Sequence, residues 1–540
     1  MRRRLSEWLT ATCPDGLRWG RVTFEESASA FPIAGLVLAV VLAWAPAFLA
    51  RNAPAAGPAG ADQGVWVMPR GDAGATGYRP EKVADPLVLL WEYETAEAIE
   101  TTPIVGSGSV YVTDVFGGVE ALSLQSGQSR WRKEMDTGFV APPALLIAAT
   151  IEAEAVDFPI LVAEAGSARS ADPNQPAEKS SKSTSEINTD KSTGTGDTGD
   201  TSEGSPQGDP PPQSTSSPRR GEDAVQETAR RLLASRLAPL LVLGDVEGNV
   251  YGLDPATGQT RWRTQVDGEI DAAASFFALV PPGPIDSWPE SSLRTALRVL
   301  VTSQDGNLRC LSASDGKLLW TYETGDQIRC GASIGGGRTF LGGCDGGLHL
   351  VDLRTGKGVG EPFSLDGPTG STPAVVDRDV FLPTMGGIVY RFSLSQAKDT
   401  DGNSTAGSPV WQYQDPDLTM EYRSDVAVGP DRIIAASKQK QVDALDRETG
   451  KLLWRKTLRR RSDASPLIAG DDVWIASTDG RLVRLSLQSG EERWSYEIRG
   501  SFLAAPALVG DRLIIADDEG VVRCFGPAEA SADRESDASL

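Results

Sequence analysis

The chain of 540 residues has few of the side chains that thiol and metal chemistry require. It contains five cysteines and one histidine, His349, and no two cysteines are spaced as C-x-x-C. Zinc ribbons, c-type haem attachment and a framework of several disulfides therefore have no support in the sequence. An enzyme that depends on histidine for base or metal chemistry is disfavoured for the same reason.

Positive charge is also scarce, because 52 Lys and Arg stand against 74 Asp and Glu, for a net charge of -22. Phosphate binding needs clustered Lys and Arg, so we do not expect a nucleic-acid partner. Adaptation to high salt and ordinary surface solubility both explain the acidity. The composition does not choose between them.

One long run without charge stands near the N-terminus, at residues 31–50. About 20 apolar residues span a bilayer, so this run predicts a transmembrane helix that acts as a signal anchor. Arginines precede it, which predicts residues 1–30 in the cytoplasm and a single-pass location in the cytoplasmic membrane, with the rest in the periplasm or outside the cell. A cleaved signal peptide is the alternative, disfavoured by the acidic residues among residues 1–30.

A repeat of about 40 residues fills most of the remaining chain. Each copy reads as an apolar strand, a glycine turn, a second strand, a T/S/D-G turn and a strand that carries tryptophan. The spacing from Trp91 to Trp131, from Trp320 to Gly360 and from Trp454 to Trp494 is 40 residues. Four short strands in such a repeat are typical of one β-propeller blade.

The count of strands predicts an all-β, eight-bladed propeller over residues 87–526, after a linker and leader at residues 51–86. Eight outer strands and eight sets of inner strands are present, but the last set, from Ala505 to Phe525, has no outer strand of its own. The surplus strand lies at Leu87–Glu100, so we expect it to complete the last blade and close the ring. Residues 527–540 are predicted to be a disordered tail.

Three insertions interrupt the blades. Residues 165–221 lack large apolar side chains and are predicted to be disordered, within blade two, with a short helix at residues 223–237 after them. Shorter insertions fall at residues 281–295 and 397–408. All three belong on one face of an up-and-down propeller. Either that face tolerates insertions, or the opposite, trimmer face docks a partner, and the sequence leaves both open.

The turn before each outer tryptophan carries a recognisable motif, A-x-D-x-x-T-G-K-x-x-W, complete at Ala444 to Trp454. A leader motif, W-x-x-x-R-G-D-x-x-x-T-G, starts at Trp66 and includes Arg70 and Asp72. Both resemble the pyrroloquinoline-quinone-like (PQQ-like) repeat family. The resemblance implies that the motif tryptophans dock between neighbouring blades, where they are structural: Trp91, Trp131, Trp262, Trp320, Trp411, Trp454 and Trp494.

Two branches of this family differ in function. One resembles quinoprotein dehydrogenases, which hold PQQ and calcium at the propeller axis, and the other resembles BamB, a non-catalytic factor in outer-membrane β-barrel assembly. The chain lacks a vicinal cysteine pair and its nearly minimal blades leave few long loops, and Asp305, Asp345 and Asp479 recur at turns, as turn formers do. We therefore expect a non-catalytic, BamB-like scaffold of the cell envelope without catalytic residues, metal or cofactor. Its expected partners are envelope proteins or peptides, among them a β-barrel assembly machine. A PQQ- and calcium-dependent oxidoreductase is the alternative.

The cysteines of the repeats fall into two groups. Cys310 and Cys524 occupy equivalent strand positions and are expected to be small buried side chains. Cys330 and Cys344 flank a predicted hairpin, and a register with residue 335 opposite residue 339 would place them across from each other. We hypothesise a disulfide between them. His349 is expected to be an ordinary packed or surface residue.

Overall fold

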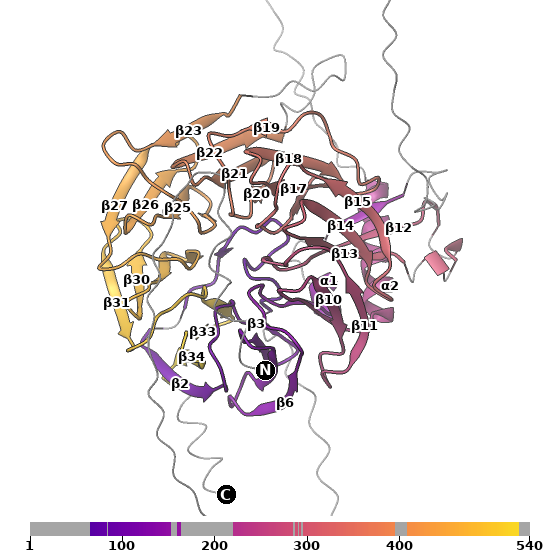
Figure 1. The fold of residues 1–540 in the computed structure, drawn as a ribbon, viewed down its shortest axis with the longest axis horizontal. Coiled ribbons are helices and arrows are strands. Elements are labelled where there is room, and N and C mark those ends of the chain that lie inside the picture. Colours follow the sequence, from indigo (N-terminus) through magenta and orange to yellow (C-terminus); the bar gives the residue numbers. More distant parts are fainter. Residues whose placement is uncertain are drawn as a thin grey trace, which may run out of the picture. The chain divides into compact units, whose positions relative to one another are not determined.

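The computed structural model describes residues 65–83, 85–152, 159–163, 220–284, 287–289, 291–292, 295–394 and 408–528. All of these residues belong to one compact unit, residues 60–540. Within it, eight sheets, each built on four antiparallel strands, surround a common centre (Figure 1). The predicted eight-bladed, all-β propeller is confirmed.

Each blade contributes its strands in order from the axis outwards. Blades 1 to 4 consist of β3 (Ile104–Gly106), β4 (Ser109–Thr113), β5 (Gly118–Ser123) and β6 (Ser129–Glu134); β7 (Ala144–Leu146), β9 (Leu240–Gly244), β10 (Asn249–Leu253) and β11 (Thr260–Gln265); β12 (Ser275–Val280), β13 (Leu297–Thr302), β14 (Asn307–Ser312) and β15 (Leu318–Glu323); and β16 (Ser333–Gly335), β17 (Arg338–Gly342), β18 (Gly347–Asp352) and β19 (Phe363–Ser364).

Blades 5 to 8 follow the same plan. They consist of β20 (Ala374–Val376), β21 (Asp379–Pro383), β22 (Ile388–Ser393) and β23 (Trp411–Gln414); β24 (Ala427–Val428), β25 (Arg432–Ala436), β26 (Gln441–Asp446) and β27 (Leu452–Thr457); β28 (Leu467–Ala469), β29 (Asp472–Ala476), β30 (Arg481–Ser486) and β31 (Glu492–Glu497); and β32 (Ala507–Val509), β33 (Arg512–Ala516), β34 (Val521–Pro527) and β2 (Leu87–Glu94).

The ring closes through β2, as the strand count predicts. β2 pairs antiparallel with β34 over its whole length, from Leu87 opposite Pro527 to Glu94 opposite Val521. The first and last strands of the propeller thus share one sheet. This arrangement leaves no blade with an unpaired third strand.

The turn between the second and third strands shows why the repeat needs glycine. In blade 2 the carboxylate of Asp245 accepts hydrogen bonds from the backbone N–H groups of Glu247 and Asn249, at 3.0 and 2.7 Å. Gly248 has a φ of +79°, and a Cβ there would lie 2.5 Å from the carbonyl oxygens of Val266 and Gly268. Glycine therefore permits both the left-handed backbone and the close approach of the loop that follows the blade.

Six seams between blades share one contact, a tryptophan on a glycine of the next blade. Trp262 of β11 is an example, since its indole N–H donates to Ala313 O at 3.0 Å and a Cβ on Gly316 would lie 2.6 Å from its ring. The other pairs, with built Cβ atoms 2.5 to 2.8 Å from the ring, are Trp91–Gly127, Trp131–Gly258, Trp320–Gly356, Trp411–Gly450 and Trp454–Gly490. The structure thus places six of the seven predicted docking tryptophans between blades in one geometry.

The two remaining seams use other aromatic contacts. Between blades 4 and 5, Phe363 of β19 lies 4.8 Å from Phe392 of β22, measured between ring centroids. Between blades 7 and 8, the ring of Trp494 meets Phe525 of β34 edge-on at 5.8 Å. The seventh predicted tryptophan therefore also lies at a seam, but against phenylalanine.

The insertions all leave from one face, here called the insertion face, which carries the turns between strands one and two and between strands three and four. The insertion of blade 2 includes α1 (Ala148–Glu152), β8 (Ile160–Val162) and α2 (Arg220–Arg236). α2 corresponds to the helix predicted at residues 223–237. The opposite face, here called the trim face, carries the turns between strands two and three and the loops between blades.

Within the described ranges no helix is long and apolar enough to cross a membrane, since α1 has 5 residues and the 17 residues of α2 include many charges. A span needs about 20 apolar residues. The predicted single-pass location in the cytoplasmic membrane is corrected on this finding. The predicted cytoplasmic segment 1–30, the span 31–50 and the linker up to residue 64 lie outside the described residues, as do residues 164–219 of the insertion and 529–540 of the tail.

The predicted disulfide between Cys330 and Cys344 is not formed. The hairpin of β16 and β17 pairs Gly335 with Arg338, one residue away from the predicted register, and such a shift turns a side chain to the opposite face. Cys330 instead packs with its sulfur against Gly342, at 3.2 Å from the carbonyl oxygen and 3.3 Å from the backbone nitrogen. Cys310 and Cys524 are fully buried, as expected.

Candidate functional site

The leader motif lies at the propeller axis. Its backbone carbonyls accept hydrogen bonds of 2.7 to 2.9 Å from backbone N–H groups at the innermost strands of blades 1, 2, 4, 5, 6 and 7. The first is from Val105 N to Trp66 O in blade 1, and the last is from Gly470 N to Arg79 O in blade 7. β1 (Tyr78–Arg79) pairs parallel with β28, and β8 covers the inner edge of blade 3 by pairing parallel with β12. These segments close the inner strand edges of seven blades.

The leader folds tightly upon itself. The carboxylate of Asp72 accepts hydrogen bonds from the backbone N–H of Thr76, at 3.0 Å, and from its hydroxyl. The guanidinium of Arg79 lies 5.0 Å from the ring centroid of Trp66 and donates to Gly71 O at 2.7 Å. Gly71 has a φ of +89°, and a Cβ there would lie 2.9 Å from the Trp66 ring. The spacing of the W-x-x-x-R-G-D-x-x-x-T-G motif thus has a structural cause.

Arg70 fixes the leader to blades 6 and 7. Its guanidinium donates to Pro466 O and Val426 O, both at 2.9 Å, and lies 3.6 Å from the carboxylate of Asp425. Burial lowers the pKa of Arg70 and raises the pKa of Asp425, while their mutual attraction opposes both shifts. The pair is a structural anchor, because its charges already face each other.

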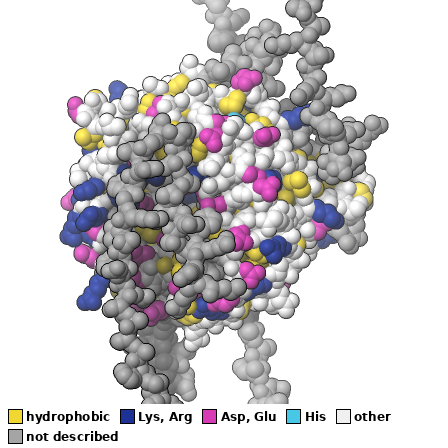
Figure 2. Space-filling model, in the orientation of Figure 1, with side chains coloured by type: hydrophobic (Ala, Val, Ile, Leu, Met, Phe, Trp, Pro, Cys, Tyr) yellow, Lys and Arg dark blue, Asp and Glu magenta, His cyan; other side chains and the backbone are white. Residues whose placement is uncertain are grey.

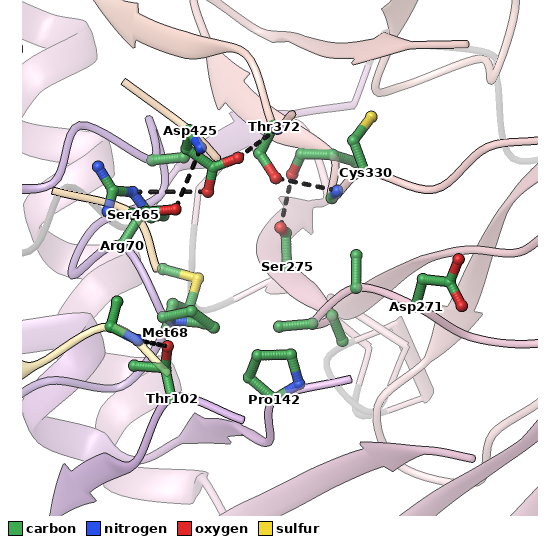
Figure 3. A pocket seen from close by; sticks show the side chains of 18 of the residues that line it. Met68, Arg70, Thr102, Pro142, Asp271, Ser275, Cys330, Thr372, Asp425 and Ser465 are labelled. Atoms are coloured by element: carbon green, nitrogen blue, oxygen red, sulfur yellow. Dashed lines mark hydrogen bonds and ion pairs between the residues drawn. The ribbon is translucent and has the colours of Figure 1, made fainter. Parts of the chain in front are cut away.

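Above the leader, the starts of the inner strands form the wall of an axial cavity on the trim face (Figure 3). Thr372 joins three blades there: its hydroxyl accepts from Gly331 N at 3.0 Å, and its N–H donates to Asp425 at 2.7 Å. Ser465 accepts from Asp425 N at 3.1 Å, and Thr102 accepts from Ala505 N at 3.2 Å. The Ser/Thr-Pro steps of the repeat therefore supply hydroxyls that link neighbouring blades around the cavity.

The cavity has a volume of about 180 Å³, and all eight blades and the leader contribute to its lining. On the side away from Arg70, the carboxylate of Asp271 accepts from Gln304 at 2.9 and 3.0 Å. Burial raises the pKa of Asp271, against the effects of Gln304 and Arg329. The site is thus a small polar hollow that offers both charges.

PQQ with calcium does not suit this cavity. Its volume lies below the ~300–1,000 Å³ of sites that bury drug-sized ligands. Calcium takes 6–8 oxygen ligands. The carboxylate of Asp72 already accepts from Thr76, and that of Asp425 already pairs with Arg70 and accepts from Thr372. Across the described parts of the chain, no group of three His, Cys, Asp or Glu could hold a metal ion.

The sequence-predicted residues lie elsewhere. None of the seven docking tryptophans lines the cavity. Asp305 and Asp345 are turn formers, as expected, because their carboxylates accept from Asn307 N at 3.1 Å and from Gly347 N at 3.0 Å. Asp345 also accepts from Gly325 N of the preceding loop at 3.0 Å. His349 is packed, with its ring between Tyr322 OH at 3.0 Å and Asp345 at 2.9 Å. Sequence reasoning missed the axial position of the leader, although charged Arg70 and Asp72 outside the blade repeat were a signal.

The trim face also exposes two large apolar side chains. Phe116, in the turn between β4 and β5, is 54% exposed, and Leu418, in the loop after blade 5, is 41% exposed. Five other blades have Asp or Glu at the position of Phe116, namely Glu247, Asp305, Asp345, Asp479 and Glu519. An exposed aromatic side chain at this position is suited to contact with another protein.

The eight blades with their tryptophan seams define an eight-bladed propeller built from PQQ-like repeats, and the leader segment covers the inner strands at its axis. A family model described as "Outer membrane protein assembly factor BamB" matches residues 222–397 and 396–529. Since these matches cover more than half of the 540 residues, the chain belongs to this family.

Individual relatives agree with this assignment. The chain is 27% identical over 274 residues to "Outer membrane protein assembly factor BamB" of Burkholderia pseudomallei, covering 43% of this chain and 67% of the relative. It is 25% identical over 264 residues to the protein of the same name from Yersinia pestis, covering 45% and 60%. The crystal structure of BamB from Moraxella catarrhalis shares the fold, with a TM-score of 0.51 at 15% identity, over 82% of this chain and 97% of that one.

Proposed function

We propose that the protein is a non-catalytic scaffold that assists the assembly of outer-membrane proteins, and that it docks components of the β-barrel assembly machinery. The observation that carries this proposal is the family match over residues 222–397 and 396–529. Two relatives with this description match 43% and 45% of the chain.

The cavity supports the non-catalytic part of the proposal. Its carboxylates already bind protein groups, and its small volume leaves little room for a substrate beside a cofactor. The side chains that a cofactor would use instead link the leader to the blades. We propose accordingly that the chain requires no cofactor.

The trim face is the proposed docking surface. It is free of the three insertions, which leave from the opposite face, and it exposes Phe116 and Leu418. Aromatic and aliphatic side chains surrounded by polar residues are typical anchors of protein interfaces. This arrangement favours partner docking over mere tolerance of insertions on the other face.

Photo-crosslinking in the native cells tests the proposal. A photoreactive phenylalanine analogue replaces Phe116 on the trim face, and in a matched control it replaces Ser314, an exposed residue of a turn on the insertion face. We expect crosslinks from position 116, and not from position 314, to a β-barrel assembly component identified by mass spectrometry. Crosslinks only from position 314, or to no such component, would overturn the proposal.

A further inference from the structure

Lys and Arg gather on one part of this acidic molecule. All eight turns between second and third strands are described, and six of them carry Asp or Glu, whereas the turn of blade 6 carries Lys438 and Lys440. The loop after blade 6 adds Arg459, Arg460 and Arg461, and the loop after blade 7 adds Arg499. These six residues are here called the basic arc. Figure 2 shows Lys and Arg gathered along the edge of the ring where Figure 1 places β27 and β31.

Backbone hydrogen bonds bring these segments together on the trim face. Leu458 N donates to Lys440 O at 2.8 Å, which places the arginine loop beside the blade 6 turn. Thr478 N donates to Arg461 O at 3.0 Å, and Ile498 N donates to Gly480 O at 2.9 Å. The arginine loop and Arg499 therefore lie on either side of the blade 7 turn, which carries Asp479.

Half of the basic arc has an ion-pair partner among the described residues, and half has none. Arg459 pairs with Glu497 at 3.2 Å, Arg461 with Asp463 at 2.9 Å and Lys438 with Glu421 at 3.6 Å, and all three pairs are reached by solvent. Such exposed pairs contribute little to stability. Lys440, Arg460 and Arg499 are exposed and form no ion pair with any described residue. Their positive charge is available to a partner.

Lys440 also has a backbone conformation for which the other blades use glycine at the equivalent turn position. Its φ is +67°, and the seven other blades place glycine at this position: Gly117, Gly248, Gly306, Gly346, Gly387, Gly480 and Gly520. Side chains other than glycine are disfavoured in this left-handed region. A strained residue at a surface turn indicates a function for its side chain, because glycine would serve the fold better.

The loops before blades 1, 2 and 3 have the opposite charge. They carry Glu97, Glu100, Asp136, Asp267, Glu269 and Asp271, and no Lys or Arg lies among residues 95–101, 135–143 or 266–274. A partner that covers this face therefore meets two oppositely charged regions. Such a pattern orients a complex more than it tightens it.

We infer that the basic arc binds an acidic segment of a partner protein, with the partner's Asp and Glu side chains over blades 6 and 7. This inference rests on the proposed function, since it assigns the orientation of a partner on the trim face. A protein segment is favoured over nucleic acid or an anionic lipid surface, because the net charge of -22 repels extended polyanions.

Fluorescence anisotropy with the purified full chain tests the inference. The probe is a labelled Glu/Ser peptide of about 20 residues, at about 50 mM salt, where screening is weak. We expect R459E/R460E/R461E to weaken binding at least tenfold. The matched control K317E/K357E/K451E reverses three exposed lysines in turns of the insertion face, and it should bind as the wild type does.

Lys440→Gly provides a second variant that cannot fail through misfolding. It should raise the midpoint of thermal unfolding by about 1–2 °C, since the strain disappears, and weaken peptide binding about two- to threefold. Binding that is absent, or equal in R459E/R460E/R461E and the control, would overturn the inference. Stronger arc-dependent binding of a DNA oligonucleotide or of vesicles with anionic lipid would also overturn it. The Phe116 crosslink tests the proposed function separately, because it does not depend on the arc.

Discussion

The six tryptophan–glycine seams and the two irregular seams differ in one feature of the blade against which the aromatic ring packs, the turn before its outer strand. Where Trp131, Trp262 or Trp454 docks, the next blade offers a tight glycine turn before its outer strand. Blade 5 has no such turn, because an insertion separates β22 from β23. Blade 8 has none either, because its outer strand β2 comes from the start of the chain.

The irregular seams show what replaces the tryptophan–glycine contact where the next blade has no glycine turn. Blade 4 precedes the interrupted blade 5, and it has Gly360 where the repeat has tryptophan, with Phe363 packed on Phe392 instead. Blade 7 keeps Trp494 but rests it on Phe525. The glycine turn is therefore required by the geometry of the six regular seams, whereas a seam without it is filled by contact between aromatic rings.

The largest expected effect follows from adding a Cβ beneath a docked ring. Gly316→Ala should destabilise the fold by about 3 kcal/mol or more, because the φ of +70° is strained and the Cβ would lie 2.6 Å from Trp262. Gly510→Ala is the control, since its φ is +57° and nothing lies within 4 Å. It should cost about 1 kcal/mol. Equal costs in urea denaturation would show that backbone strain alone, and not the seam, requires glycine.

A smaller effect separates the indole hydrogen bond from ring packing. Trp262→Phe should cost about 2 kcal/mol, because it leaves Ala313 O without its donor at a buried seam. Trp320→Phe should cost about 1 kcal/mol or less, because the buried Trp320 N–H has no hydrogen-bond partner. The difference is measured by chemical denaturation. A larger loss at Trp320 would contradict the role given to the hydrogen bond.

The smallest effect concerns the acid stability of blade 4. Burial alone would raise the pKa of Asp345, but hydrogen bonds from His349, Gly325 and Gly347 hold this pKa below its usual value. Its contribution to stability is therefore present above the unfolded-state pKa and is lost as the pH falls through the lower folded-state pKa. Asp345→Asn should reduce the loss of stability between about pH 5 and pH 2 by about 1 kcal/mol. An unchanged pH dependence of urea unfolding would contradict this assignment.

The fold could be predicted from the sequence because its information is repeated. The eight blades and the closing strand at Leu87–Glu94 follow from counting copies of one pattern, and no single copy has to be perfect. The register around Cys330 could not be predicted, since the Gly335-Gly336-Gly337 run allows pairings one residue apart. A disulfide depends on that one residue.

The site was less predictable because its contacts join distant parts of the chain. Arg70 bonds to Pro466 O, and no local pattern announces a contact across 396 residues. Lys440 was hidden for another reason: the sequence shows a lysine in a turn, but the positive φ that singles it out appears only in the structure. The composition predicted no nucleic-acid partner from total charge, yet total charge conceals the basic arc.

We propose that the trim face docks a partner in outer-membrane protein assembly. The most direct test is the amount of folded outer-membrane β-barrel proteins in native cells whose only copy carries Phe116→Glu and Leu418→Glu. The control carries Leu318→Glu and Leu452→Glu, which change equally exposed leucines on outer strands. We expect the trim-face variant to match a deletion strain, with fewer folded β-barrels, and the control to match the wild type. Normal β-barrel levels in the trim-face variant, or in the deletion strain itself, would contradict the proposal.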